Sequence, residues 1–225
     1  PRILKPFLPA PSMPYYPHID SPAFMQPTQF SANDHGQAEV PMKKLFAAAL
    51  IELCRESPLE KITVRHLLEK TGAGRQTFYR HFHDKNDLIQ WTFRHEILYL
   101  SPDGRDFYNC WLTYYKRLDT YRHFMAQAGK LIGQNCLKEY MYQCTIGWYQ
   151  KQYVKYYSSS VLPPDLEFAV KYHAYGIEPV IIDWVNDEFQ ATCEDMADYS
   201  CSCQPALLHK YPFIDDLFCG KVSSN

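Results

Sequence analysis

The chain has 225 residues, of which 46% are hydrophobic and 21% are charged, and its formal net charge is −2. These values predict a protein that buries a real core, in one domain or two small ones. A charge near zero excludes a protein whose whole surface is basic, but it leaves room for one basic face. No apolar run reaches the roughly 18 residues of a membrane span, and the first ten residues lack a signal-peptide pattern. We therefore expect a cytoplasmic protein without a membrane partner.

Residues 1–40 differ in composition from the rest of the chain. Eight of the 16 prolines fall within the first 36 positions, among Ser, Gln and His. Proline removes a backbone donor and blocks helix formation. We therefore predict a disordered Pro-rich tail, which is either a partner-binding arm or a stretch without a role.

The eight cysteines are predicted to be reduced thiols. Most of them lie in segments with helical periodicity, and the chain contains no Cys-x-x-Cys pair. Cys201 and Cys203 are two residues apart, but two further ligands at suitable spacing are missing. We therefore expect no metal site.

From Pro41 onward the apolar residues recur at helical spacing, and few runs alternate as a strand would, which predicts an all-α fold. The first helix, Met42–Arg55, places Leu45, Phe46, Ala49, Leu50 and Leu53 on one stripe. A helix from Asp87 to about Leu100 is predicted to start at a cap, either Asp84 or Asn86. The later helices are predicted at 106–118, 120–128, 133–157, 164–188 and 192–203.

Two short predicted helices, 64–70 and 75–82, are separated by a tight turn. Thr63 is a favourable N-cap for the first of them, and Gly72 can adopt a positive φ at its end. Two short helices joined in this way form a candidate helix-turn-helix, the motif that places its second helix in the DNA major groove.

The second short helix is mostly polar, with Phe78 and Phe82 as its apolar anchors. Arg and Gln read base edges in the major groove, and hydroxyls and cations contact phosphates. Residues 41–100 contain ten Lys and Arg against seven Asp and Glu, whereas residues 101–225 contain eleven against fifteen. We predict a DNA-binding surface formed by Thr63, Arg65, Arg75, Gln76, Thr77, Tyr79, Arg80, His81 and Lys85.

The segment Thr71–Phe82, together with Lys61–Val64 before it and Lys85 and Leu88 after it, resembles the TetR family of bacterial repressors. A looser pattern in the C-terminal part, which includes Tyr175-Gly176 and Asp183-Trp184, resembles the dihydroxyacetone-kinase-regulator-like branch. Two positions depart from the family pattern: Gly74 stands where Ser or Thr is usual, and Gln76 stands where Gly is usual.

The resemblance implies a three-helix helix-turn-helix domain over 41–100, a helical regulatory and dimerisation domain over 101–210, and a flexible C-terminus over 211–225. It also implies a homodimer, paired through the predicted helices 164–188 and 192–203, that binds palindromic double-stranded DNA. The expected function is a transcriptional regulator, a repressor released by a small-molecule effector. The alternatives are a TetR-like regulator controlled by a partner protein, and an interaction protein with little DNA binding.

Aromatic residues are frequent in the C-terminal part, where they could line an effector pocket, although most are expected to belong to the core. His173 could contact a ligand, but the favoured interpretation is a core histidine whose hydrogen bonds are satisfied, and no effector-binding residue is assigned. The chain contains no Gly-x-Gly-x-x-Gly, no phosphate loop, no His-Glu-x-x-His and no Gly-x-Ser-x-Gly. We therefore expect neither a cofactor nor an enzyme.

Overall fold

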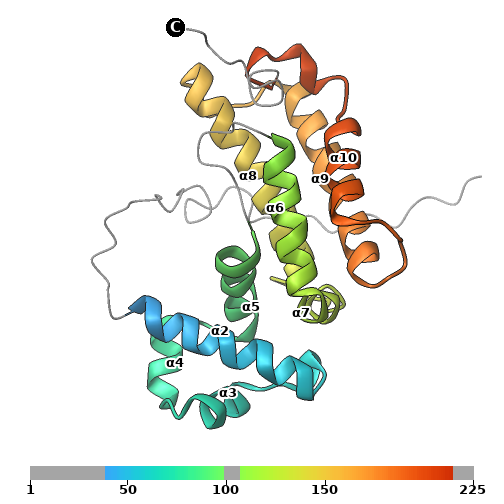
Figure 1. Ribbon diagram of the computed structural model, residues 1–225. Helices are drawn as coiled ribbons and strands as arrows, with labels where there is room; N and C mark the ends of the chain where they lie inside the picture. The colour runs from blue at the N-terminus through green and yellow to red at the C-terminus, as the bar shows by residue number, and fades with distance from the viewer. Residues whose placement is uncertain (1–38, 99–106, 215–225) are drawn as a thin grey trace, which may run out of the picture. The chain divides into compact units, whose positions relative to one another are not determined.

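The computed structural model describes residues 39–98 and 107–214 (Figure 1). Within these ranges the chain forms helices and connecting turns without a β-strand, which confirms the all-α prediction. The expected tail falls outside the described residues up to position 38, as does the expected flexible C-terminus from position 215 onward. The first helices are α2 (Glu39–Glu56), the 3-10 turn η1 (Leu59–Lys61), α3 (Val64–Thr71), α4 (Arg75–His81) and α5 (Lys85–Thr92).

Helix α2 begins at Glu39, three residues before the predicted start, because Pro41 lies in its first turn, where proline is tolerated. Phe46 and Leu50 are fully buried, as predicted. The placement of Leu45 on the buried stripe was wrong, because its side chain is 44% exposed. Each helical residue turns about 100° from the last, so a buried face that includes Phe46, Ala47 and Leu50 leaves Leu45 on the opposite side.

The caps of the short helices are formed by the residues predicted from the sequence. The Thr63 hydroxyl oxygen accepts a hydrogen bond from the backbone N–H of His66 at the start of α3, and Gly72 ends that helix with φ 69°. Gly74 caps α4 in an extended conformation, and the Asp84 carboxylate accepts from the backbone N–H of Asp87, 2.8 Å away. Gly74 therefore serves as the N-cap of α4 in place of the usual Ser or Thr.

The predicted single helix from Asp87 to about Leu100 has a different form. Helix α5 ends at Thr92 and continues as a π-helical turn, η2 (Phe93–Ile97), in which the Leu98 N–H donates to the Phe93 carbonyl 2.8 Å away. Leu98 then adopts an extended conformation, so the helix stops there. Residues 99–106 lie outside the described part of the chain.

The C-terminal helices lie close to their predicted positions. They are α6 (Phe107–Thr120), α7 (Arg122–Ala128), α8 (Leu137–Tyr157), α9 (Pro164–Val185), α10 (Cys193–Ser202) and the 3-10 turn η3 (Leu208–Lys210). Helix α8 starts four residues later than predicted, because Gly133 and Asn135 have positive φ angles that no helix accepts. Helix α9 ends at Val185 rather than at 188, since Asp187 adopts a left-handed conformation.

A large cluster of buried side chains connects α2, α4 and α5 with α6 to α10, and a smaller cluster lies where α8, α9 and η3 meet. Helix α7 packs against α2, η1 and α9. The seven cysteines in the described ranges are free thiols. Searches of the same residues find no cluster of three metal-ligating side chains and no helix suited to crossing a membrane.

Candidate nucleic-acid interface and ligand cavity

Helix α4 presents a polar surface held in place by two buried rings. Phe78 and Phe82 are buried, and both meet the ring of Phe46 edge-on, with centroids 5.2 and 6.1 Å apart. With these anchors facing inward, Arg75, Gln76, Tyr79 and Arg80 are exposed, while Thr77 and His81 are half-buried. The structure therefore brings six of the predicted DNA-binding residues onto one short helix.

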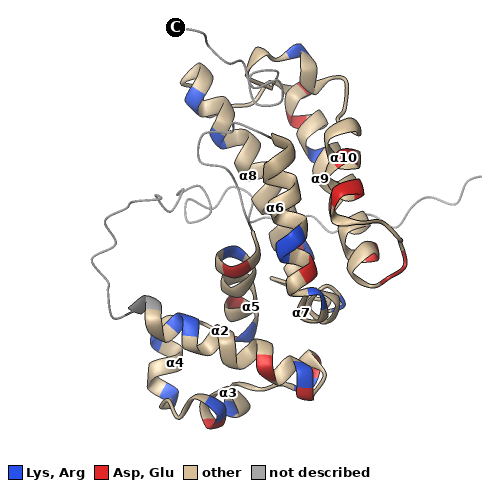
Figure 2. Ribbon diagram, viewed as in Figure 1, with Lys and Arg blue, Asp and Glu red and all other residues tan. Residues whose placement is uncertain are grey.

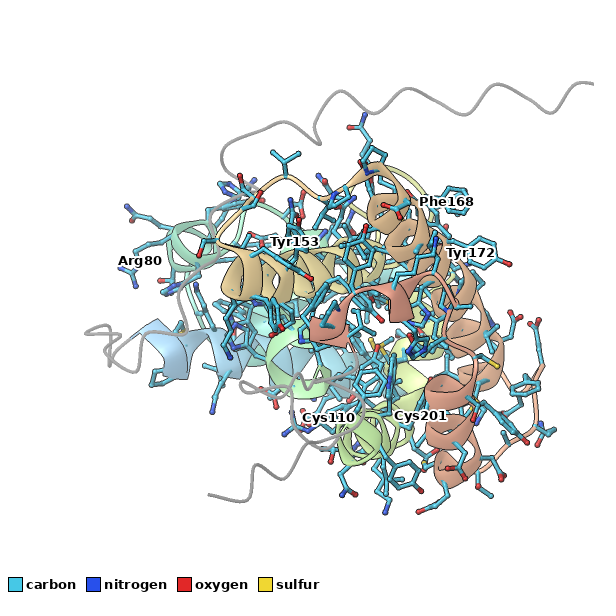
Figure 3. The ribbon with its side chains drawn as sticks, turned by 90° about the horizontal axis from the view of Figure 1, so that it is seen from above. Arg80, Cys110, Tyr153, Phe168, Tyr172 and Cys201 are labelled. Carbon is cyan, nitrogen blue, oxygen red and sulfur yellow. The ribbon has the colours of Figure 1, made fainter. Side chains whose placement is uncertain are left out.

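Four of these residues, Gln76, Thr77, Tyr79 and Arg80, line an open hollow on the surface of α4. The guanidinium of Arg75 lies over the ring of Tyr79, 5.5 Å from its centroid. Figure 3 shows Arg80 extending away from the helices. Cation–π contact restricts the Arg75 side chain before any ligand arrives, which lowers the entropy cost of binding.

The charges around α4 favour an anionic partner. Helix α4 carries two arginines and no acidic residue (Figure 2). On the neighbouring helix, Arg65 is paired with Glu69 at 2.8 Å, and Lys70 is paired with two glutamates of α2. The cations of α3 are therefore partly neutralised, whereas those of α4 face solvent. Thr63 remains exposed at the start of α3, although its oxygen already serves as the helix cap.

Lys85 has a role that differs from the expected phosphate contact. Its Nζ donates to the carbonyl oxygens of Leu59 and Ile62, both 2.8 Å away, and to that of Glu60 at 3.3 Å. An ammonium has three N–H donors, so these carbonyls use all of them. Burial lowers the pKa of Lys85 from its usual value. We therefore remove Lys85 from the candidate phosphate contacts and assign it the positioning of η1 and the start of α3.

Two side chains of α7 bind the end of α2, and sequence reasoning missed both. His123 Nε2 lies 2.8 Å from the carbonyl oxygen of Cys54, and the Gln127 amide nitrogen donates to the same oxygen at 2.7 Å. The Gln127 amide oxygen accepts from the backbone N–H of Leu59. Helix α7 therefore completes the hydrogen bonding of the backbone that leads into the helix-turn-helix.

A cavity of about 60 Å³ lies between α6, α8, α9 and the end of η2. Four of the aromatic residues expected to be core or pocket residues line it: Trp111, Tyr114, Trp148 and Tyr149. The other lining residues are Phe93, Leu98, Phe107, Cys110, Met141, Cys144, Thr145, His173 and Glu178. No sequence pattern indicates Thr145 or Glu178, because these residues are 33 positions apart and meet only in the fold.

The lining contains buried polar groups with unused hydrogen-bonding capacity. Glu178 accepts a 2.7 Å hydrogen bond from the Thr145 hydroxyl through one carboxyl oxygen, and its Oε2 has no partner among the described residues. Burial raises the pKa of Glu178 to about 7. His173 is also buried, burial lowers its pKa to about 4, and its Nε2 has no partner in the described ranges. The expectation of a satisfied core histidine was therefore wrong.

The comparisons with known proteins all point to one family of transcriptional regulators. A TetR family model, described as a transcriptional regulator C-terminal region, matches residues 106–202. Over 66 residues the chain is 29% identical to the HTH-type dhaKLM operon transcriptional activator DhaS of Lactococcus lactis subsp. lactis (strain IL1403). That alignment covers 29% of this chain and 35% of the relative, so the chain matches about a third of the relative's length.

A solved structure of the dihydroxyacetone kinase operon activator DhaS has a similar fold. The TM-score is 0.56 at 18% sequence identity, and the match covers 76% of this chain and 98% of the other. At this identity the likeness concerns the arrangement of helices alone.

Proposed function

This chain belongs to the TetR family, in the DhaS-like branch, and on that basis we propose that it is a sequence-specific DNA-binding regulator of transcription. The observation that carries the proposal is the exposed polar face of α4, anchored by Phe78 and Phe82. A short helix with a buried apolar side and an uncompensated basic side is suited to the major groove.

The roles of the α4 side chains follow from their chemistry. Arg75 and Gln76, in the first turn, are proposed to read base edges, because their forked donor groups match guanine and adenine. Tyr79 and Arg80 are proposed to contact phosphates. The remaining proposed phosphate contacts are Thr63, Arg65, Thr77 and His81.

A homodimer is proposed from the exposed apolar side chains of α9. Phe168 and Tyr172 are each 66% exposed and Tyr175 is 52% exposed, at spacings of four and three residues. Figure 3 shows Phe168 and Tyr172 directed away from the neighbouring helices. Contiguous exposed aromatic residues on one helix face mark an interface. A two-fold dimer would present two copies of α4, so the operator is proposed to be a palindrome.

Control by a small-molecule effector is proposed from the cavity among α6, α8 and α9. Its aromatic walls and its unpaired polar atoms are typical of a ligand site. The proposed regulation is repression released by the ligand, as expected from the family; the curated relative is named an activator. A reporter gene placed under the selected operator measures whether the protein represses or activates transcription.

The test of DNA recognition is a selection from randomised duplexes with the full chain. We expect enrichment of one palindromic sequence. The Arg80→Ala variant should bind that sequence more weakly and with a salt slope lower by about 1. Lys130→Ala is the matched control, because it removes an equal charge from an exposed position outside α4. Selection without an enriched sequence would contradict the proposal and would favour control through a protein partner.

The dimer has its own test. Sedimentation velocity should give a dimer for the wild type and a monomer for Tyr172→Glu, since a charge on the exposed face of α9 would prevent association. A monomeric wild type at DNA-binding concentrations would contradict the proposed interface.

A further inference from the structure

The cavity lining, as far as the structure describes it, contains an acidic side chain but no strongly basic one. Among the described residues the lining contains one carboxyl group, Glu178, and neither Lys nor Arg. His173 is neutral at physiological pH because burial lowers its pKa to about 4. The cavity therefore offers no counter-charge to an anion, and it offers a carboxylate to a cation.

The buried side-chain nitrogen and oxygen atoms that have no hydrogen-bond partner among the described residues all belong to side chains that line this one cavity. They are Trp111 Nε1, Trp148 Nε1, His173 Nε2 and Glu178 Oε2. Buried polar atoms are normally hydrogen-bonded, and a group of four exceptions around one cavity points to a missing partner. The indole nitrogens can only donate, whereas Glu178 Oε2, when ionised, can only accept.

Aromatic rings form much of the remaining lining. The Phe107 ring contacts both indoles, with its centroid 5.8 Å from that of Trp111 and 6.2 Å from that of Trp148. Ring faces attract cations, and this attraction is strongest where water is excluded. The volume of about 60 Å³ is several times the roughly 10–15 Å³ that a cavity needs to hold one water, so the cavity has room for a small molecule.

From these observations we propose that the cavity binds a small protonated amine that also carries one oxygen acceptor, such as a short amino alcohol. The ammonium pairs with Glu178 Oε2 and contacts the aromatic rings, and the ligand oxygen accepts from an indole N–H. This pairing neutralises a carboxylate that Thr145 alone stabilises. The inference rests on the proposed function only for its regulatory consequence, since binding itself requires no DNA.

The experiment compares three compounds of equal size by calorimetry on the full chain. The probes are 3-aminopropan-1-ol, n-butylamine, which keeps the charge but lacks the oxygen, and 1,3-propanediol, which keeps the oxygens but lacks the charge. We expect the amino alcohol to bind at least about tenfold more tightly than either of the others. Fluorescence of Trp111 and Trp148, which line the cavity, provides a second readout.

Two variants and a control separate the contribution of the Glu178 charge from that of the Trp148 N–H group. Glu178→Gln keeps the shape and removes the charge, so it should weaken amino alcohol and butylamine binding by about tenfold or more and leave the diol unchanged. Trp148→Phe keeps the ring and removes the N–H, so it should weaken the amino alcohol and leave butylamine unchanged. Glu188→Gln, at an exposed acidic position, should change nothing. Circular dichroism verifies that each variant is folded.

Two results would overturn the inference. Equal binding of diol and amine, unaffected by Glu178→Gln, would show that the cavity selects neutral molecules. Failure of all three probes to bind would show that it holds water only. Amine binding by a protein that binds no specific DNA would instead contradict the proposed function and leave this inference standing.

Discussion

The ammonium nitrogen of Lys85 lies 2.8 Å from the carbonyl oxygen of Ile62, 23 residues earlier in the chain. Together with the bond to Leu59, this contact ties the first residue of α5 to the segment that enters α3. The helix-turn-helix is thereby closed by a half-buried cation as well as by its apolar core.

Replacing Lys85 by Met should therefore affect stability more than DNA binding. Three carbonyls would lose their donor, and we expect the free energy of unfolding to fall by about 1–3 kcal/mol in a urea titration. Lys61→Met, at an exposed position of η1, is the control and should change it by less than about 0.5 kcal/mol. A Lys85→Met variant of unchanged stability but weaker DNA affinity would restore the phosphate contact.

Phe78 anchors α4, so its loss should unfold the recognition helix. Phe78→Ala removes a fully buried ring that contacts Phe46, and we expect a loss of about 3–5 kcal/mol in the free energy of unfolding. Leu45→Ala removes an apolar side chain of the exposed side of α2 and should cost less than about 0.5 kcal/mol. Equal free energies of unfolding for the two variants would show that the Phe78 ring does not stabilise the protein.

Gln76 departs from the family pattern and is exposed on α4. Gln76→Ala should weaken the preference for one base in each half-site. The difference in binding free energy between the preferred duplex and duplexes substituted at that base should shrink by about 1–3 kcal/mol. The measurement is a selection from duplexes randomised at single positions. The same base preference in wild type and variant would exclude Gln76 from base reading.

Glu178 should make stability depend on pH. Its pKa is about 7 in the folded protein against an ordinary value of 4.5, so the folded state disfavours ionisation and the wild type loses stability as the pH rises through 7. Glutamine does not ionise. The stability of Glu178→Gln relative to wild type should therefore increase by about 2 kcal/mol between about pH 5 and pH 8.

Urea titrations of both proteins at the two pH values measure this difference. His173, whose pKa shifts downward, and Tyr114, whose pKa shifts upward, also line the cavity. His173 is present in both proteins and contributes equally to each, and Tyr114, whose pKa burial raises well above 10, does not titrate between pH 5 and pH 8. A difference independent of pH would mean that the Glu178 carboxyl is not desolvated in the folded protein.

The features predicted from the sequence are those determined by local chemistry. Caps such as Thr63 and Asp84 depend on residues within one helical turn, and the left-handed Gly72 depends on its own backbone freedom. The anchors Phe78 and Phe82 follow from spacing on a single helix. Such local signals are sufficient to predict the candidate interface on α4.

The features that sequence reasoning missed depend on distant parts of the chain. Leu45 lies outside the core because neighbouring helices select which side of α2 is buried. The contact of Lys85 with Ile62 and that of Gln127 with Cys54 join residues far apart in sequence. Glu178 and Thr145 meet in the lining of the cavity only when α8 and α9 pack together.

The central claim is that α4 makes sequence-specific contacts with DNA. Its most direct test is fluorescence anisotropy of the full chain on fragments of its own upstream DNA, at about 50 and 200 mM salt. We expect tight binding to one fragment, steep weakening at the higher salt because phosphate contacts release counterions, and a smaller salt slope for Arg80→Ala. Weak binding that is equal for all fragments would contradict the claim.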